Sequence, residues 1–484
     1  MSSGPAVVEA GVVVLGAGPG GYAAAFRAAD LGLDVTLIDP EPEPGGVCLF
    51  RGCIPSKALL HQAALIDEAA AAAERGIAFG RPEIDLARLR AWKDGVVQTL
   101  TRGLGQLAKS RGVRRMHGRG AFLDRDLLEV TTEEGAWSRL RFQHCIVATG
   151  SRPAVVPGLD TDSPLVMNST EALELPDAPG RLLVVGGGYI GLELATVYAA
   201  LGSKVTVVEM TDGLLPGVDR DLVRVLAKRL GQRLEAVLLG TKVAKLTLEA
   251  DRCRVALEGG AGSPEQTFDR VLVAVGRRPN ASGLGLKHTA VTLDERGFVV
   301  VDAQRRTAER GIFAIGDVAG EPMLAHKATH EGLVAAEAVA GRPVAFEPAA
   351  IPAVVYTDPE IAWCGLTEAR AKREGRAVQV GRFPWAASGR ALTLGRGDGL
   401  TKLLVDPDSR RVLGAGIVGH GAGELIAEVV HAIEMGAVAE DLALTIHPHP
   451  TLSETVMEAA EVALGQAVHI YAPATRRGAG GTEG

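Results

Sequence analysis

The 484-residue chain is poor in cysteine and in aromatic residues, and it lacks long uninterrupted apolar runs. Five cysteines, an odd number in so long a chain, exclude the disulfide framework of a small secreted protein. No apolar run approaches the ~18 residues that span a bilayer, and the start of the chain, residues 1–9, is not typical of a signal peptide. These absences favour a cytoplasmic protein without a membrane anchor.

The chain also lacks an excess of positive charge, with 51 Lys and Arg residues against 58 Asp and Glu residues. The net charge of −7 and the absence of a basic stripe give no electrostatic case for binding nucleic acid. Glycine, by contrast, is abundant: 61 glycines and a hydrophobic content of 47% indicate a globular protein with many tight turns. Since one hydrophobic core rarely serves so long a chain, the length predicts roughly three domains.

A glycine-rich turn between a strand and a helix occurs twice, at a shift of 170 positions. The first turn, 16–21, follows an apolar strand at 12–15 and precedes a helix expected at 22–31. The second turn, 186–191, follows a strand at 182–185 and precedes a helix that ends near 201. In both copies a second strand ends at an acid, Asp39 or Glu209, at the same distance from the first glycine.

A single Gly-x-Gly-x-x-Gly is weak evidence, but strand, helix and acid together are what a dinucleotide-binding fingerprint requires. The first glycine makes the turn, the second lets a pyrophosphate approach the backbone, and the third packs the helix against the strand. The helix N-terminus attracts the anion. We therefore predict two dinucleotide sites, the first with Gly16, Gly18, Gly21 and Asp39 and the second with Gly186, Gly188, Gly191 and Glu209.

Domain boundaries follow from apolar strands that end in glycine and an Arg-Pro turn, at 145–150 and at 271–276. The prediction is an α/β protein with two Rossmann-like dinucleotide-binding domains and an α+β C-terminal dimerisation domain. Strands near 354–356, 403–405 and 414–418 indicate an antiparallel sheet, followed by helices at 422–435 and 453–464. The expected divisions are a first nucleotide domain at 1–152, a second at 153–281, a central segment at 282–350, the C-terminal domain at 351–472 and a disordered tail at 473–484.

Cys48 and Cys53 are close enough in sequence to close as a short disulfide ring. Pro55 suits the first turn of a helix, so Cys53 should lie at or near a helix N-terminus, where partial positive charge favours the thiolate. Lys57 is four residues further and should share the face of Cys53. A zinc half-site would need a second pair of soft ligands, which the sequence lacks, so we predict redox chemistry and no metal. The three single cysteines are expected to be inert: Cys145, Cys253 and Cys364.

A second chemical signal lies near the end of the chain, in the Pro-flanked segment 445–454. Two histidines separated by one residue, His447 and His449, fit metal ligands or simply polar side chains in a turn. His449 with Glu454 five residues on also fits a general base with an orienting carboxylate.

Residues 45–60, GGVCLFRGCIPSKALL, resemble the active-site segment of the pyridine nucleotide–disulfide oxidoreductases, and within that family most resemble the dihydrolipoamide dehydrogenases. The resemblance extends from Val12 to about Ala472, and Phe50 departs from it at a position where asparagine is more frequent. It implies FAD and NAD as cofactors, Cys53 as the thiol that exchanges with substrate, and Cys48 as the thiolate against the flavin.

The same resemblance assigns further residues. His449 becomes the acid–base catalyst, contributed by the partner subunit of a homodimer, with Glu454 beside it, while His447 is structural. Glu193 matches the acid that pairs with Lys57. Asp39 matches the acid on the FAD ribose, and Asp317 the acid on the ribityl chain. Further cofactor contacts are expected at Lys57, Gly120, Thr149, Gly150, Met323, Leu324, Ala325 and His326 for FAD, and at Tyr189, Ile190, Val243 and Gly276 for NAD.

The implied activity is oxidation of protein-bound dihydrolipoamide with NAD+, on the lipoyl-bearing E2 or H-protein of 2-oxoacid dehydrogenase or glycine-cleavage complexes. Glutathione reductase fits less well because the SKALL continuation differs and no basic site for a 2′-phosphate is present. Mercuric reductase would need a C-terminal cysteine pair, which is absent. A non-catalytic flavoprotein scaffold or redox sensor would not need a full catalytic set, and this chain has one: Cys48, Cys53, His449 and Glu454.

Overall fold

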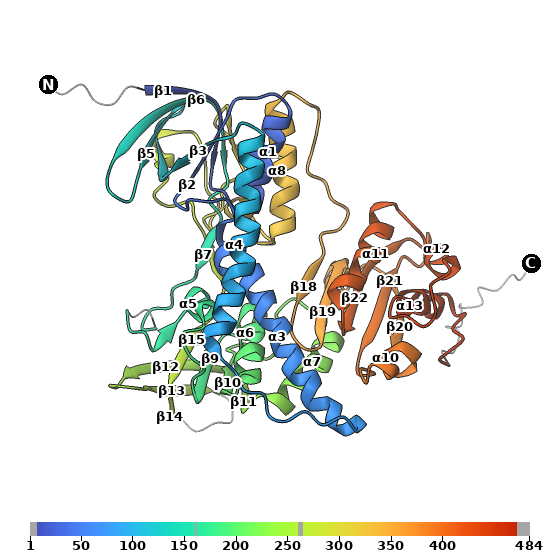
Figure 1. The fold of residues 1–484 in the computed structure, drawn as a ribbon. Coiled ribbons are helices and arrows are strands. Elements are labelled where there is room, and N and C mark those ends of the chain that lie inside the picture. The colour runs from blue at the N-terminus through green and yellow to red at the C-terminus, as the bar shows by residue number, and fades with distance from the viewer. Residues whose placement is uncertain (1–6, 160–161, 260–264, 472–484) are drawn as a thin grey trace, which may run out of the picture.

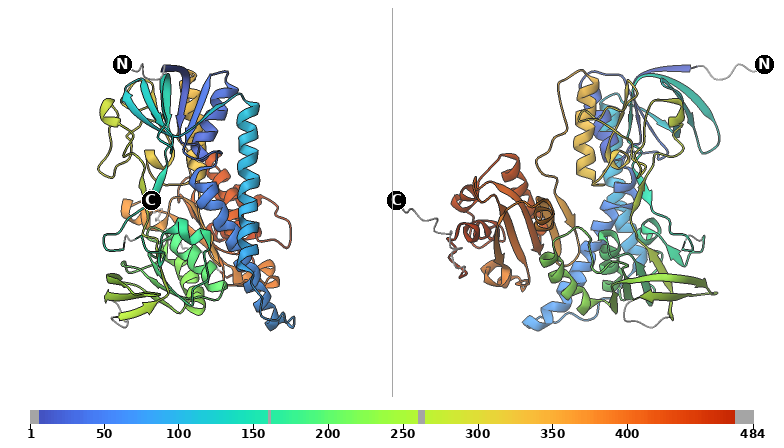
Figure 2. Two further views of the ribbon diagram at one scale, coloured as in Figure 1. Left: turned by 60° about the vertical axis from the view of Figure 1, so that its left-hand side comes forward. Right: turned by 180° about the vertical axis from the view of Figure 1, so that it is seen from behind.

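The computed structural model describes residues 7–159, 162–259 and 265–471, and it confirms the predicted α/β class (Figure 1). Two units built on mainly parallel sheets are followed by a third, antiparallel unit, drawn in orange to red, which lies to one side of the other two in Figure 1 and in the right-hand view of Figure 2. The tail expected to be disordered, 473–484, lies outside the described residues. Within those residues, no helix has both the length and the apolar character that a membrane crossing requires.

The first sheet is ordered β3-β2-β1-β6-β5-β4, with β17 paired to β6. The strands β3, β2, β1, β6 and β17 run parallel, whereas β4, β5 and β6 form an antiparallel meander that the sequence did not predict. β17 belongs to the central segment and joins a sheet whose other strands end by residue 147. The bounds are β1 Val7–Leu15, β2 Val35–Asp39, β3 Arg114–His117, β4 Arg119–Asp124, β5 Leu127–Thr131, β6 Trp137–Val147 and β17 Ile312–Ala314.

Two helices, α1 (Pro19–Asp30) and α8 (Ala325–Val339), cover one face of this sheet and pack closely on each other. Glycine permits the approach: a Cβ on Gly332 would lie 2.5 Å from the carbonyl oxygen of Gly20. The alanines of both helices pack with Val12 and Val14 in one apolar cluster. α1 begins three residues earlier than predicted, because Pro19 fits a first helical turn.

The second sheet is wholly parallel and ordered β11-β10-β9-β15-β8. Helices α5, α6 and α7 pack with it, and a separate antiparallel meander, β12-β13-β14, extends from it. A two-stranded ribbon, β7 with β16, joins the first and second units, so the predicted boundary at 152/153 falls inside β7. The bounds are β7 Ser151–Pro153, β8 Val166–Met167, α5 Ser169–Glu174, β9 Arg181–Val185, α6 Tyr189–Ala200, β10 Lys204–Val208, α7 Arg220–Arg233, β11 Ala236–Leu238, β12 Thr241–Leu248, β13 Cys253–Gly259, β14 Glu265–Phe268, β15 Arg270–Val273 and β16 Arg277–Pro279.

The third unit is the antiparallel sheet that the sequence predicted, ordered β18-β19-β22-β21-β20. Two helices, α11 and α13, pack against it around a core that includes Trp385 and Phe383. The bounds are β18 Ala353–Val355, β19 Glu360–Gly365, α9 Glu368–Glu374, β20 Gln379–Pro384, α10 Gly389–Thr393, β21 Leu400–Val405, β22 Val412–Gly419, α11 Ala422–Glu434, α12 Ala439–Leu444 and α13 Glu454–Leu464.

One hydrophobic core joins the three units. The helix α3 (Cys53–Ala71), which runs beside the long helix α4 (Leu86–Ser110), contributes Leu59 and Leu60. The second sheet contributes Leu182 and Val184, and the third contributes Val355, Ile361 and Val418. Because these side chains share one cluster, the third unit is packed directly against the second rather than tethered by a linker alone.

Candidate active site

The two glycine turns repeat each other down to individual hydrogen bonds. Ala17 N–H donates to Asp39 at 2.6 Å, and Gly187 N–H, 170 positions on, donates to Glu209 at 2.7 Å. The third glycine of each turn has no room for a side chain: a Cβ on Gly21 would lie 1.8 Å from Gly16 O, and one on Gly191 would lie 2.2 Å from Gly186 O. The predicted internal repeat is therefore a repeat of structure.

Each acid of the repeat also accepts an N–H from two residues further on, Glu41 for Asp39 and Thr211 for Glu209, at 2.8 Å in both cases. Burial raises the pKa of the Asp39 carboxyl, and the N–H groups of Ala17 and Glu41 oppose the rise. Both carboxylates are thus fixed beside their glycine turn, in the position where a nucleotide ribose is bound by this fingerprint.

A cavity of about 630 Å³ opens in front of the first turn and extends to the second unit. The residues around it suit FAD. The helix α1 starts there with Gly18 at its N-cap and no side chain capping it, so backbone N–H groups are free to bind a pyrophosphate. Predicted residues that line the cavity are Gly16, Gly18, Gly21, Asp39, Gly120, Thr149, Gly150, Asp317, Met323 and Ala325 on the FAD side, and Tyr189 and Ile190 from the second turn.

The cysteine pair opens onto this same cavity. Cys48 lies in a short helix, α2 (Gly46–Arg51), and Cys53 is the first residue of α3, as the position of Pro55 predicted. The two thiols are free and hydrogen-bonded to each other. The bond from Cys48 outweighs the effect of burial and, with Lys57, lowers the pKa of Cys53 to about 7, whereas that bond and burial raise the pKa of Cys48. Cys53 is therefore the thiol of the reduced pair that is poised to ionise near neutral pH, whereas the family resemblance assigns the thiolate against the flavin to Cys48.

Lys57 is fixed by a buried acid on α6. Its Nζ lies 2.8 Å from Oε2 of Glu193, which is 4% exposed, and 4.4 Å from the ring centroid of Tyr356. Ser56 donates to the same oxygen at 2.9 Å, and Tyr356 N–H donates to Oε1 at 3.0 Å. The predicted partners Lys57 and Glu193 thus meet, and Glu193 joins α3 to the start of the third unit.

Asp317 accepts a hydrogen bond from Ser151 Oγ at 2.6 Å, and Arg277 donates to the same hydroxyl at 2.7 Å. Thr149 donates to the carbonyl of Asn280 at 2.9 Å. These contacts fix the end of the first sheet against the β7–β16 ribbon. The sequence analysis did not single out five residues of the site: Ser56, Ser151, Arg277, Asn280 and Tyr356. The one sequence signal near any of them was the Arg-Pro turn at 277–279, which follows the second apolar strand as a similar turn follows the first.

Other predicted cofactor residues lie beside the cavity or farther from it. Leu324 is the N-cap of α8, and His326 Nε2 lies 2.7 Å from the carbonyl oxygen of Pro352, away from the cavity lining. Val243 lies in β12 and packs against the apolar cluster of the second unit. Gly276 follows β15 at a φ of +113°, which suits glycine.

His449 and Glu454 form a pair on the third unit, before α13. Nδ1 of His449 lies 2.8 Å from Glu454 Oε1, and Thr451 N–H donates to the other oxygen at 2.7 Å. Burial alone would raise the pKa of Glu454, but these two partners hold it below its ordinary value. The His449 side chain is 79% exposed, and neither it nor Glu454 lines the cavity that contains the cysteines.

His447, by contrast, is buried between Glu428 and the carbonyl of Thr445, at 2.8 Å from each. Its surroundings match the structural role expected of it. The two histidines of the segment therefore differ: one is tied into its own domain, and the other presents its ring to solvent.

Two comparisons match nearly the whole chain. The profile of the pyridine nucleotide-disulphide oxidoreductases matches residues 10–332, and that of the dimerisation domain of the same family matches residues 351–460. A protein of Vibrio cholerae named dihydrolipoyl dehydrogenase is 51% identical over 456 residues, which cover 94% of this chain and 96% of that protein. A protein of Haloferax volcanii with the same name is 50% identical over 462 residues, which cover 95% of this chain and 97% of that protein.

Solved structures agree with the fold. The crystal structure of LpdA from Mycobacterium tuberculosis superposes with a TM-score of 0.86 at 28% identity, covering 94% of this chain and 99% of that one. The Cu(II) complex of the HOCl-induced flavoprotein disulfide reductase RclA from Escherichia coli gives 0.83 at 28% identity, with the same coverage.

Proposed function

The chain belongs to the pyridine nucleotide-disulphide oxidoreductase family, and we propose that it acts as a dihydrolipoyl dehydrogenase. Its cofactors are FAD and NAD. The observation that carries the proposal is that the Cys48–Cys53 pair, the first glycine turn and the start of α6 all line one cavity. A dithiol, a flavin and a nicotinamide nucleotide can therefore act on one another within one site.

In the proposed reaction, a thiolate of the substrate attacks Sγ of Cys53 in the oxidised pair, which breaks the Cys48–Cys53 bond and forms a mixed disulfide. The second substrate thiolate then breaks the mixed disulfide, so the cyclic disulfide leaves and both cysteines are reduced. Gly16, Gly18, Gly21 and Asp39 would hold FAD in the cavity onto which the cysteines open, and the bound flavin would supply the two-electron chemistry that links the reduced cysteines to NAD+. Lys57, which Glu193 holds in place, stabilises the thiolate of Cys53 in the reduced pair.

His449 is proposed to remove the proton from the substrate thiol, with Glu454 fixing the imidazole through Nδ1. We place it in the cysteine site of a second copy of the chain, which makes the enzyme a homodimer. The dimerisation-domain match over 351–460 supports this arrangement. Two exposed apolar residues near His449 also support it: Leu444 is 80% exposed and Ile446 is 95% exposed. Apolar side chains that are this exposed suit burial by a partner subunit.

The substrate is proposed to be a lipoyl group carried by another protein, the E2 of a 2-oxoacid dehydrogenase or the H-protein of the glycine-cleavage system. The relatives that carry the name dihydrolipoyl dehydrogenase support the lipoyl chemistry. We propose that the protein is located in the cytoplasm. The reducing environment there keeps thiols reduced, so a cytoplasmic disulfide is usually transient and catalytic.

NAD+ is proposed as the preferred nicotinamide, because Glu209 can accept a ribose 2′-hydroxyl and would repel a 2′-phosphate. The residues that follow, 210–212, contain no arginine or lysine to bind that phosphate. Equal catalytic efficiency with NADP+ would contradict this assignment.

The test of the proposed function is a steady-state assay of the FAD-loaded enzyme with dihydrolipoamide, reduced glutathione and each of the two oxidised nicotinamides. Efficient oxidation of dihydrolipoamide by NAD+ is expected, with little activity towards glutathione. A preference for glutathione would favour a sibling reductase. Bound FAD with no dithiol oxidation would favour a scaffold or sensor.

A further inference from the structure

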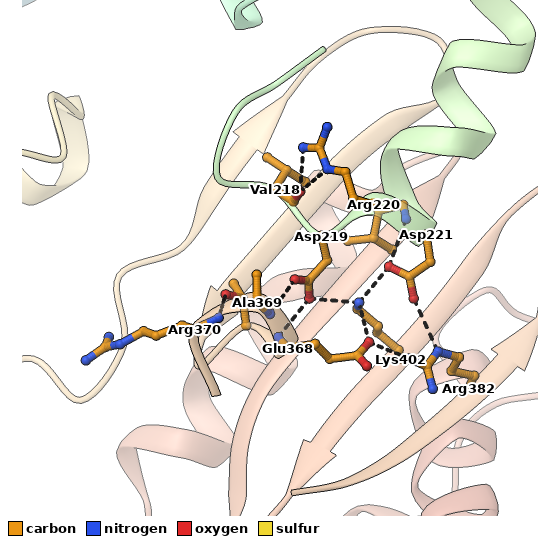
Figure 3. Close-up of polar contacts among 11 residues, drawn as sticks. Val218, Asp219, Arg220, Asp221, Glu368, Ala369, Arg370, Arg382 and Lys402 are labelled. Carbon is orange, nitrogen blue, oxygen red and sulfur yellow. Dashed lines mark hydrogen bonds and ion pairs between the residues drawn. The ribbon is translucent and has the colours of Figure 1, made fainter. Parts of the chain in front are cut away.

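A buried lysine connects the third unit to the start of α7. Lys402, on β21, is 1% exposed, and its ammonium is surrounded by three carboxylates (Figure 3). Nζ lies 2.8 Å from Asp219, 2.7 Å from Asp221 and 2.8 Å from Glu368. Burial lowers the pKa of Lys402, but the three carboxylates outweigh burial and raise it overall, so the ammonium stays charged.

The carboxylates come from two units, so the cluster crosses a domain interface. Asp219 and Asp221 flank Arg220 at the start of α7 in the second unit, whereas Glu368 begins α9 in the third. Asp219 does not cap its own helix; it accepts the N–H groups of Glu368 and Ala369, each at 3.0 Å. Arg382 completes the cluster by binding Asp221 and Glu368. Removing the lysine would leave these acids facing one another across an interface where Asp219 and Asp221 are largely shielded from solvent.

Arg220, between the two aspartates, holds the loop that leads back to the second glycine turn. Its guanidinium donates to the carbonyl oxygens of Leu214, Leu215 and Val218, at 2.8, 2.6 and 2.6 Å. Leu215 N–H donates to Gly187 O at 3.0 Å. Leu215 has a φ of +50°, a left-handed conformation that costs a leucine energy and persists only where its surroundings impose it. The loop 213–218 is therefore fixed between Arg220 and the glycine turn.

We propose that Lys402 is a positioning residue for the nicotinamide nucleotide. By holding Asp219 and Asp221 on either side of Arg220, its ammonium fixes the loop 213–218 against Gly187, and so fixes the backbone that receives the pyrophosphate. The lysine belongs to the dimerisation domain, so that domain shapes a site it does not line. The inference rests on the proposed function, because it takes the second turn as the NAD site.

The experiment compares Lys402→Met with Lys242→Met in the FAD-loaded enzyme. Lys242, on β12 of the second unit, makes an exposed ion pair with Glu258 at 3.2 Å, so it controls for the loss of a lysine charge. Hydrogen exchange over residues 213–219, measured without nicotinamide, should quicken in Lys402→Met alone. The KM for NADH with ferricyanide as acceptor should rise roughly ten-fold. Flavin reduction by dihydrolipoamide, measured without NAD+, should stay near the wild-type rate.

Unchanged exchange and KM in folded Lys402→Met would overturn the proposal, as would an equal loss in both half-reactions, which would indicate a general structural role. If Lys402→Met does not fold, Glu368→Gln decides: it removes one half-exposed carboxylate and should change exchange and KM in the same direction by a smaller factor, and no change overturns the idea. Failure of wild-type protein to oxidise dihydrolipoamide would instead refute the proposed function, since exchange and NADH–ferricyanide kinetics need no dithiol.

Discussion

Cys53 and His449 stand in opposite surroundings within one chain. Around the cysteines, Lys57 is paired with Glu193, a buried acid with three hydrogen-bond donors from two units. Around His449, Glu454 is the partner of a ring whose side chain is 79% exposed. The cysteine site has its charges balanced by its own chain, whereas the histidine is oriented but not enclosed. An oriented, solvent-exposed base suits a surface completed by another molecule.

The largest effect should separate the two thiols. Cys53→Ser should abolish turnover, because no thiol remains to exchange with the substrate. The Cys53 thiol raises the pKa of Cys48, so the removal of the Cys53 thiol should favour a Cys48 thiolate. That variant should therefore show a long-wavelength thiolate–flavin band while its flavin is oxidised. Absorbance spectra of Cys53→Ser and Cys48→Ser provide the check. A band in Cys48→Ser alone would mean that the two roles are exchanged.

Loss of the base should rank next. His449→Gln should bind FAD normally but oxidise dihydrolipoamide about 10²- to 10⁴-fold more slowly, the usual contribution of a positioned general base. His447→Gln is the matched control, since His447 is held by Glu428 and lies out of reach of solvent. Turnover by His449→Gln within a few-fold of wild type would contradict the assignment.

The orienting acid should matter less than the base. Glu454→Gln keeps the shape of the side chain and removes the charge that faces Nδ1 of His449. Turnover should fall, but by a smaller factor than in His449→Gln, because Glu454 moves no proton itself. Steady-state rates of the two variants, measured side by side, test which substitution costs more turnover. A greater loss of turnover in Glu454→Gln than in His449→Gln would contradict the prediction.

The smallest effect concerns pH. The pKa of about 7 at Cys53 predicts that alkylation of the reduced enzyme by iodoacetamide rises as pH passes through about 7, when the thiolate forms. Lys57→Met removes a cation that favours the thiolate, so the profile should move to higher pH. Mass spectrometry of alkylated Cys53 across a pH series gives both profiles. An unmoved profile would show that Lys57 does not stabilise the thiolate.

Sequence predicted the parts of this molecule that depend on local pattern. The glycine turns, their strands and acids, and Cys53 at the start of α3 all follow from short-range spacing and backbone preference. The strands β3, β4 and β5 were not predicted, because each is only four to six residues long and they bury no residue, one residue and two residues, respectively. Contacts between distant residues, such as Tyr356 with Glu193 and Lys402 with Asp219, left no local signal.

The most direct test of the account asks whether the exposed histidine serves a second chain. Cys53→Ser and His449→Gln chains, each inactive alone, are mixed under conditions that exchange subunits, and dihydrolipoamide oxidation is measured. A mixed dimer has one site with both an intact cysteine pair and an intact histidine, so activity should reappear in proportion to the mixed dimers formed. Mixed dimers that form and stay inactive would contradict the account, because the base would then act within its own chain or would not be His449.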